Sequence, residues 1–139
     1  MLRKIRSLAL KNTRGVVVDI EADVSPGLPY FNIVGLADTS VKEASERVRR
    51  AIRNSGFEYP KGRITVNLSP AYIHKRGSHF DLGIALGILS ALQIITEDME
   101  NRILVGELSF DGSILPVTRL MPMLAAIVDD PSVEEVLLA

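Results

Sequence analysis

The sequence contains no cysteine among its 139 residues. This absence excludes a disulfide framework, a thiolate nucleophile and a cysteine-based zinc site. An excess of one charge is also missing, because 16 lysine and arginine residues balance 17 aspartate and glutamate residues, for a formal net charge of −1. A surface that binds nucleic acid would therefore have to come from a local cluster of basic residues.

No secretory signal or membrane span is expected in these residues. The N-terminus, MLRKIRSLALKN, lacks the long apolar region of a secretory signal. The most apolar segment, Leu82–Ile95, is shorter than the about 20 residues that cross a bilayer. The chain has no GxxxxGK[ST] motif, so it cannot bind a nucleotide phosphate in the manner of a P-loop. We expect a cytoplasmic protein that does not interact with membranes.

The hydrophobic pattern predicts strands and helices in the order βββ-α-β-α-ββ-α-β, which is typical of a mixed α+β fold with one mixed sheet. Its 139 residues suit a single domain. The last residues, EEVLLA, end inside a strand-like run, and we expect a longer parent protein. The first three strands are predicted to form one antiparallel unit. The predicted strands are 2–10, 15–24, 30–34, 63–68, 103–108, 114–115 and 134–138, and the predicted helices are 41–52, 82–95 and 118–128.

Segment Leu82–Ile95 is apolar on nearly all sides, which predicts a central buried helix. Its small residues, Gly83 and Gly87 with Ala85 and Ala91, indicate close packing against a neighbouring element. The loop before this helix is where we expect a site, because backbone N–H groups at a helix N-terminus lack intrahelical partners.

The helix predicted over Val41–Ile52 is amphipathic. Residues Asp38 to Ser40 offer possible N-caps, Ser40 with Glu43 has capping-box spacing, and Gly56 is expected to end the helix. The pairs Glu43–Arg47 and Glu46–Arg50 have favourable i,i+4 spacing on a solvated, net-basic face.

Ser78 is the sharpest candidate for a catalytic residue, because a serine near a helix N-terminus has the surroundings of an acyl-transfer nucleophile. It would need a lysine or histidine as base, and the chain has no lysine after Lys75. We therefore favour helix capping for Ser78 and also for Asp81. His74 and His79 lack the ligand spacing of a zinc site, and a surface or capping role is favoured for both.

Four basic residues, Lys61, Arg63, Lys75 and Arg76, could lie on one edge if the strand that begins at Arg63 returns through the loop at Lys75. Such an edge would suit phosphate or an acidic partner. Only Tyr72 is interleaved with them, so the stacking platform of single-strand binders is missing and a solvated face is favoured.

Three long segments together resemble the N-terminal domain of the ComM/YifB family, which are bacterial magnesium-chelatase-like AAA+ ATPases. They are Phe31–Ala71, Lys75–Leu89 and Val105–Val117. The resemblance implies a ribosomal-protein-S5 domain 2-like fold, which the proteolytic domain of Lon shares. It also implies a downstream AAA+ module that binds ATP and magnesium, a hexamer, and possible DNA contact, with no cofactor in this domain. The family includes a helicase that promotes DNA branch migration in natural transformation.

The resemblance to Lon can be followed position by position. Aligned on Gly77, the nucleophile position of Lon falls on His79, and Ser78 takes the place of a proline. After the run Gly106-Glu107, Gly112, Leu115-Pro116 and Leu120, the position of the general-base lysine falls on Met121. Both members of the dyad are missing. We expect a non-catalytic accessory domain of an AAA+ ATPase. The alternatives are a nucleic-acid-binding module that uses the basic edge and a weak Ser–Lys peptidase in which Lys75 acts as base.

Overall fold

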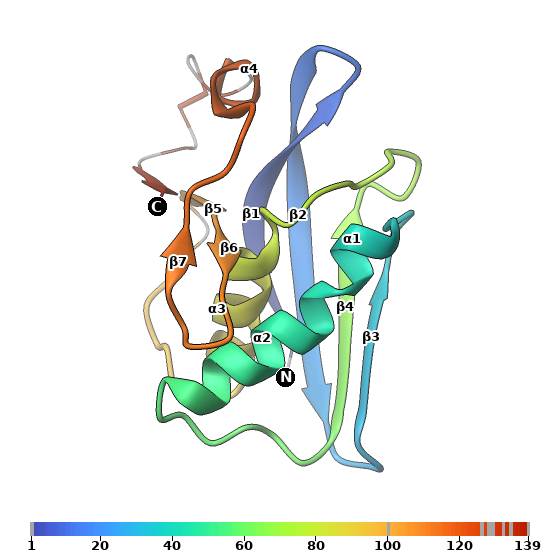
Figure 1. Ribbon diagram of the computed structural model, residues 1–139, viewed down its shortest axis with the longest axis vertical. Coiled ribbons are helices and arrows are strands. Elements are labelled where there is room, and N and C mark those ends of the chain that lie inside the picture. Colours follow the sequence, from blue (N-terminus) through green and yellow to red (C-terminus); the bar gives the residue numbers. More distant parts are fainter. Residues whose placement is uncertain are drawn as a thin grey trace.

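A six-stranded sheet with the strand order β3-β4-β2-β1-β5-β8 forms the centre of the molecule (Figure 1). The structure, a computed structural model, describes residues 2–99, 101–125, 127, 130–131, 133 and 135–138. The strands of this sheet are β1 (Leu2–Lys11), β2 (Arg14–Ser25), β3 (Tyr30–Val34), β4 (Arg63–Ser69), β5 (Arg102–Val105) and β8 (Glu135–Leu138). A separate hairpin contains β6 (Glu107–Leu108) and β7 (Ile114–Leu115). The helices are α1 (Thr39–Lys42), α2 (Ala44–Asn54), α3 (Asp81–Ala91) and α4 (Leu120–Leu124).

The sheet is mixed, which confirms the predicted fold class. β2 pairs antiparallel with β1 and β4, whereas β3 pairs parallel with β4, and β5 pairs parallel with β1 and β8. The prediction of one antiparallel unit from the first three strands was wrong, because β4 lies between β2 and β3. Parallel neighbours need a crossover connection, which α1 and α2 provide between β3 and β4.

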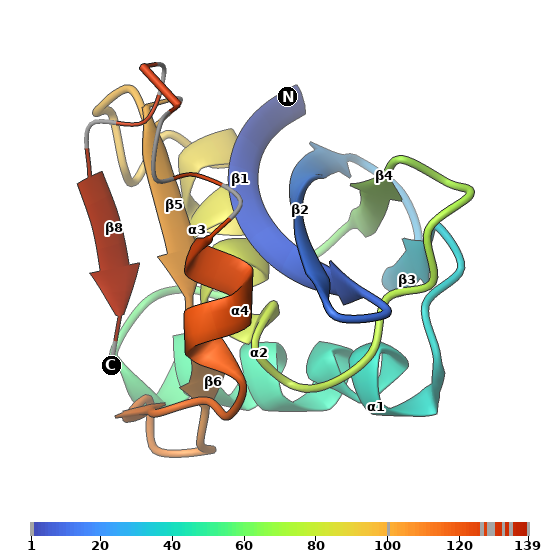
Figure 2. The same cartoon turned by 90° about the horizontal axis from the view of Figure 1, so that it is seen from above.

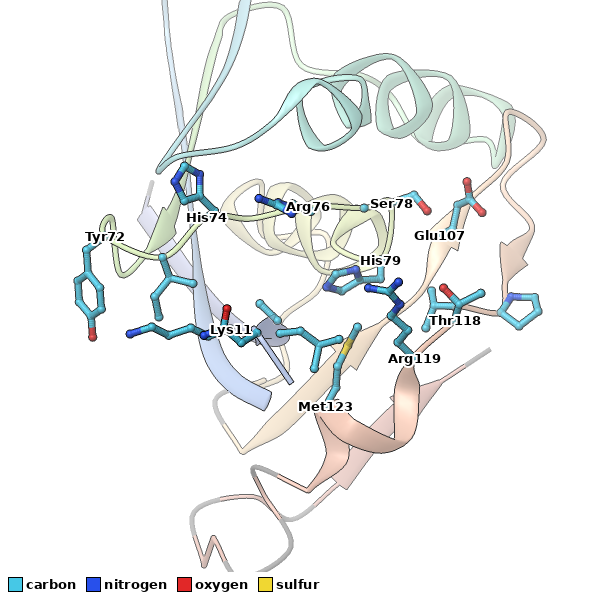
Figure 3. Close-up of a pocket in the computed structure, with 17 residues that line it drawn as sticks. Lys11, Tyr72, His74, Arg76, Ser78, His79, Glu107, Thr118, Arg119 and Met123 are labelled. Carbon is cyan, nitrogen blue, oxygen red and sulfur yellow. The ribbon is translucent and has the colours of Figure 1, made fainter. Parts of the chain in front are cut away.

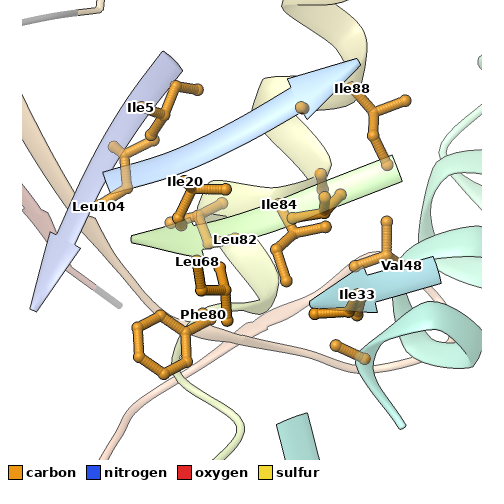
Figure 4. Close-up of a cluster of buried hydrophobic side chains, with 14 of the residues drawn as sticks. Ile5, Ile20, Ile33, Val48, Leu68, Phe80, Leu82, Ile84, Ile88 and Leu104 are labelled. Carbon is orange, nitrogen blue, oxygen red and sulfur yellow. The ribbon is translucent and has the colours of Figure 1, made fainter. Parts of the chain in front are cut away.

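Helix α3 is buried on almost every side, as the apolar run predicts. It packs across β1 and β2 on one face, with α2 beyond it, and Figure 4 shows Ile84 and Ile88 among side chains from the sheet and from α2. The small residues permit this close approach. A Cβ atom at Gly83 would lie 2.5 Å from Ile20 Cδ1, and one at Gly87 would lie 3.1 Å from Ala22 Cβ.

The helix predicted over 41–52 is divided at Glu43 into α1 and α2. Asp38 is the N-cap of α1, and its side chain accepts a hydrogen bond from the N–H of Val41 at 3.0 Å. At the other end, Gly56 has a φ of +89°. Phe57 N–H donates to Ile52 O at 3.2 Å, and Gly56 N–H donates to Arg53 O at 3.1 Å. These two bonds form a Schellman motif, so Gly56 ends the helix as predicted.

The opposite face of the sheet carries α4. Leu8, Ile103 and Val105 form a second apolar cluster with Met123 of this helix, and Figure 2 shows α4 beside β1 and β5. Helix α4 begins at Leu120 rather than at Thr118, and the predicted end at Val128 lies outside the described residues. The predicted start of the last strand, Glu134, lies outside them too.

The strand predicted over 103–108 is broken at Gly106. The Gly106 N–H donates to His79 O, and Gly106 O accepts from the Leu82 N–H, each at 3.1 Å. These bonds direct the backbone of Gly106 toward the start of α3 instead of toward a strand neighbour. The chain then leaves the main sheet and forms the β6–β7 hairpin, whose first strand contacts α3.

Candidate functional site

The loop from Pro70 to Phe80 lines a pocket of about 690 Å³ at the end of β1 and the start of α3 (Figure 3). Four segments form its walls: residues 9–12 at the end of β1, residues 72–74 and 76–79 of the loop, Glu107 of β6, and residues 116–119 with Met123. Serine, histidine, glutamate and three cationic side chains all border it. This is the place where the sequence predicts a site.

Lys75 anchors the loop and is fully buried. Its ammonium group donates hydrogen bonds to Gly35 O at 2.7 Å and to Pro70 O. Its backbone N–H donates to Leu36 O at 3.0 Å, and its carbonyl accepts from the Asp38 N–H at 3.1 Å. Burial lowers the pKa of this ammonium group. These internal bonds of Lys75 therefore hold the loop in place, and its ammonium group does not contribute to a basic surface.

A second contact joins the loop to the start of α1. Gly77 has a φ of +92°, a conformation that glycine adopts without strain. Its N–H donates to Ser40 Oγ at 2.9 Å, and the Ser40 hydroxyl donates to Asp38 Oδ1 at 2.6 Å. The candidate capping residue Ser40 thus binds the loop, while the neighbouring Asp38 caps the helix.

His79, at the position of the Lon nucleophile, is buried, which corrects the predicted surface role. Its Nε2 lies 2.6 Å from Leu8 O, so this nitrogen carries the proton and donates it. Its ring lies against that of Phe80, with centroids 4.1 Å apart. Burial lowers the pKa of the imidazole, although the bond to Leu8 acts in the opposite direction. The side chain forms part of the pocket floor in its neutral form.

Asp81 does not cap α3, contrary to the prediction. Phe80 occupies the N-cap position without a side-chain hydrogen bond. The Asp81 carboxylate, which is fully buried, accepts from Arg47 Nε at 2.6 Å and Nη2 at 3.1 Å, and from the Leu108 N–H at 3.1 Å. Burial raises the pKa of Asp81, and the bonds from Arg47 and Leu108 oppose this rise. Arg47 thus turns inward from α2, although its sequence position predicts a solvated face.

Ser78 is half-buried and lines the pocket. Its carbonyl accepts the Asp81 N–H at 3.2 Å, so the loop reaches the start of α3 through its backbone instead of through the serine hydroxyl. The base that the peptidase alternative requires, Lys75 Nζ, is directed to the carbonyls of Gly35 and Pro70. Met121, at the position of the Lon lysine, has 76% of its surface exposed and does not line the pocket.

Lys61 and Arg63 lie far from this pocket. They are at the start of β4, whereas the loop follows its end, and the seven residues of the strand span about 20 Å. The predicted basic edge therefore does not form, since the strand that separates Arg63 from Lys75 is fully extended. Lys61 instead borders a second pocket with Arg49 and Arg53 of α2. We call Arg49, Arg53, Lys61 and Arg63 the lower basic cluster.

Arg76 belongs to a different group, which the sequence did not indicate. Lys11 and Arg119 border the same pocket from β1 and from the segment before α4. All three side chains are exposed, and we call Lys11, Arg76 and Arg119 the rim cations. Arg119 adopts a φ of +58°, which is uncommon for a residue with a side chain. The residues are far apart in sequence, and no pattern in the chain connects them.

Comparison with known proteins identifies the family. The family model described as subunit ChlI of Mg-chelatase matches residues 20–139. The chain belongs to this family. Competence protein ComM of Haemophilus influenzae is 42% identical to it over 123 residues, which are 88% of this chain and 24% of that protein. YifB of Escherichia coli is 43% identical over 115 residues, which are 78% of this chain and 23% of that protein.

A protein of Mycobacterium tuberculosis is also 43% identical, over 121 residues. The chain spans about a quarter of the length of the curated relatives it matches. The resemblance to the ComM/YifB family predicted from the sequence is thereby confirmed. The matched region includes the whole loop and α3. In the described part of the chain, no helix is long and apolar enough to cross a membrane, and no three acidic or histidine side chains form a metal site.

Proposed function

We propose that this chain is a non-catalytic accessory domain of a ComM/YifB-like AAA+ ATPase. The parent protein would be an ATP-driven DNA branch-migration helicase that acts in natural transformation or recombination in the cytoplasm. Its AAA+ module would bind ATP and magnesium, and this domain would contact that module and the neighbouring subunits of a hexamer. The name of the similar competence protein ComM of Haemophilus influenzae supports a role in competence.

The bond between His79 Nε2 and Leu8 O carries this proposal. The residue at the nucleophile position has one of its two ring nitrogens, Nε2, bonded to the backbone of β1. A proton-accepting group is also missing from the position of the Lon lysine, because Met121 is apolar and exposed. Ser78 in turn would need Lys75 as base, and the ammonium group of Lys75 is bonded to two carbonyls. A pocket of this construction suits binding better than acyl transfer.

Two measurements test the proposal. The full-length protein, with and without residues 1–139, should be compared for ATP hydrolysis and for ATP-dependent branch migration of a three-stranded DNA substrate. We expect hydrolysis to persist and branch migration to fall when the domain is removed. Unchanged branch migration after the deletion would contradict an accessory role in DNA processing.

A fluorophosphonate probe tests the peptidase alternative. We expect no labelling of Ser78 in the full-length protein, with an established serine hydrolase as the positive control. Labelling that disappears in Ser78→Ala would show an activated serine and would overturn the non-catalytic assignment.

A further inference from the structure

We propose that the pocket beside α3 binds single-stranded nucleic acid, with phosphates held by the rim cations and a base stacked on Tyr72. This inference deepens the proposed function and rests on it for the choice of DNA as the first probe. It assigns the contact to a specific surface of the domain, and that surface differs from the basic edge expected from the sequence.

The charge of the rim favours an anionic ligand. Lys11, Arg76 and Arg119 approach the pocket from three separate segments. Among the charged side chains of the lining, these three cations outnumber the single carboxylate, that of Glu107. Within the described residues, neither Arg76 nor Arg119 forms an ion pair or a side-chain hydrogen bond. Exposed guanidinium groups of this kind can donate two parallel hydrogen bonds to a phosphate.

An exposed aromatic side chain supplies the second element of the site. Tyr72 has 74% of its surface exposed, and Lys11 Nζ lies 5.7 Å from the centre of its ring. Figure 3 shows Lys11 and Tyr72 on one side of the pocket, and Thr118 and Arg119 on the other, with His79 between them. A phosphate near Lys11 would bring the adjacent base within reach of the Tyr72 ring. Tyr72 is a single ring, so it would stack one base instead of forming the multi-ring platform that the sequence lacks, and such stacking tolerates any base.

The loop that carries Tyr72 and Arg76 is held rigidly. In the middle of the loop, the ammonium group of Lys75 donates hydrogen bonds to the carbonyls of Gly35 and Pro70, and the Gly77 N–H donates to the Ser40 hydroxyl. Both exposed side chains therefore project from a backbone that is ordered before a ligand arrives. Such preorganisation lowers the entropy cost of binding.

The lower basic cluster lacks this arrangement, although it also contains aromatic residues. The guanidinium of Arg63 lies 5.2 Å from the ring centre of Tyr30, and that of Arg53 lies 5.0 Å from the ring centre of Tyr59. Arg49 donates to both carboxylate oxygens of Glu46 at 2.7 Å. Its three arginines therefore already contact rings or a carboxylate, which a nucleic-acid strand would have to displace, whereas Arg76 and Arg119 of the rim have no such partner among the described residues. It serves as a matched control for the pocket.

The affinity of the full-length protein for fluorescein-labelled (dT)12, measured by anisotropy without ATP, tests the proposal. Replacing both guanidinium groups in Arg76→Gln/Arg119→Gln should raise the Kd at least about tenfold, since two phosphate contacts are lost. Lys61→Gln/Arg63→Gln removes the same charge and should change the Kd by less than about twofold. Equal losses in both variants, or a loss in the second alone, would overturn the proposal.

The stacking contact has its own test. Tyr72→Ala should raise the Kd about fivefold or more, and Tyr72→Phe should keep it within about twofold, because the ring is retained. Equal affinity of all three proteins would contradict stacking. A 5-iodouracil oligonucleotide should photo-crosslink to Tyr72 in the wild type. Crosslinks confined to other segments would place the strand elsewhere and overturn the proposal, even if other domains bind DNA.

Competitors distinguish the ligand class. Unlabelled (dT)12 and (U)12 should displace the probe, whereas dTMP, inorganic phosphate and polyglutamate should not do so at comparable concentration. Displacement by phosphate or dTMP would make the pocket a small-anion site, and displacement by polyglutamate would indicate an acidic protein partner. Either result would overturn the proposal. If the pocket variants bind normally while deletion of the domain still impairs branch migration, this inference fails and the proposed function stands.

Discussion

Basic side chains lie near both ends of β4, but the surroundings of these side chains differ between the two ends. At the start of the strand, the lower basic cluster lies on the surface and its arginines contact tyrosine rings and a glutamate. Beyond the end of the strand, the rim cations border a pocket whose loop and adjoining helix start contain three buried polar groups, namely Lys75, His79 and Asp81. The position of a basic residue in the sequence does not distinguish these two surroundings. The bonds of Lys75 and His79 attach the loop that lines the pocket to the backbone of Gly35 and of β1.

The largest effect should come from breaking the buried ion pair between Arg47 of α2 and Asp81 at the start of α3. Asp81→Asn leaves Arg47 partly buried without its bidentate partner, and we expect the free energy of unfolding to fall by about 3–5 kcal/mol. Chemical denaturation measures the change. The control, Glu46→Gln beside the lower basic cluster, breaks the exposed pairs with Arg49 and Arg50 and should have a much smaller effect. Similar losses in the two variants would remove the distinction between the two ends.

Lys75→Met is the next test. The substitution keeps an apolar stem of similar length and leaves the carbonyls of Gly35 and Pro70 without their donor. We expect a loss of about 1–3 kcal/mol in the free energy of unfolding. The matched variant Lys61→Met at the other end of β4 should change it by no more than about 0.5 kcal/mol. A neutral Lys75→Met would show that the loop does not depend on this anchor.

The pH dependence of stability tests the state of His79. Because burial lowers the pKa of the folded imidazole below its usual value of about 6.5, the unfolded chain binds more protons as the pH falls. The contribution of His79 to stability is therefore fully present above about pH 6.5 and should be lost as the pH falls below it, by at most about 1.4 kcal/mol per pH unit. His79→Gln should remove this slope, whereas His74→Gln, at an exposed position, should keep it. A slope retained in His79→Gln would assign it to another group.

The smallest effect is expected at Met121. Met121→Lys restores the residue type at the position of the Lon base, but the side chain is exposed and outside the pocket lining. We expect no fluorophosphonate labelling of Ser78 in this variant and no change in thermal stability. Labelling that appears only in Met121→Lys would show that the pocket retains the geometry of a protease.

Much of the fold could be predicted because local patterns determine it. The apolar run of α3 and the small residues Gly83 and Gly87 indicate a buried, closely packed helix, and the structure contains one. Local sequence patterns do not determine which strand pairs with which in the sheet. β3 has the same alternation whether it pairs with β2 or β4, and only the crossover through α2 places it beside β4.

The candidate site could be predicted in position but not in detail. The loop before α3 does line a pocket, yet Lys75 was expected on a basic edge and Asp81 as a helix cap, whereas both side chains are fully buried. Charged residues are rarely fully buried unless they are paired. Their partners are the carbonyls of Gly35 and Pro70 and the side chain of Arg47, which lie up to 40 residues away. Arg119 joins Arg76 at the pocket through tertiary packing alone, so no sequence spacing predicts the pair.

The salt dependence of (dT)12 binding tests the central claim, that the pocket rather than the lower basic cluster contacts the nucleic acid. The slope of log Kd against log salt concentration counts the phosphate contacts, at about 0.7 for each contact with a single strand. We expect the slope to fall by about 1.4 in Arg76→Gln/Arg119→Gln and to stay at the wild-type value in Lys61→Gln/Arg63→Gln. An unchanged slope in the first variant, with a reduced slope in the second, would contradict the account.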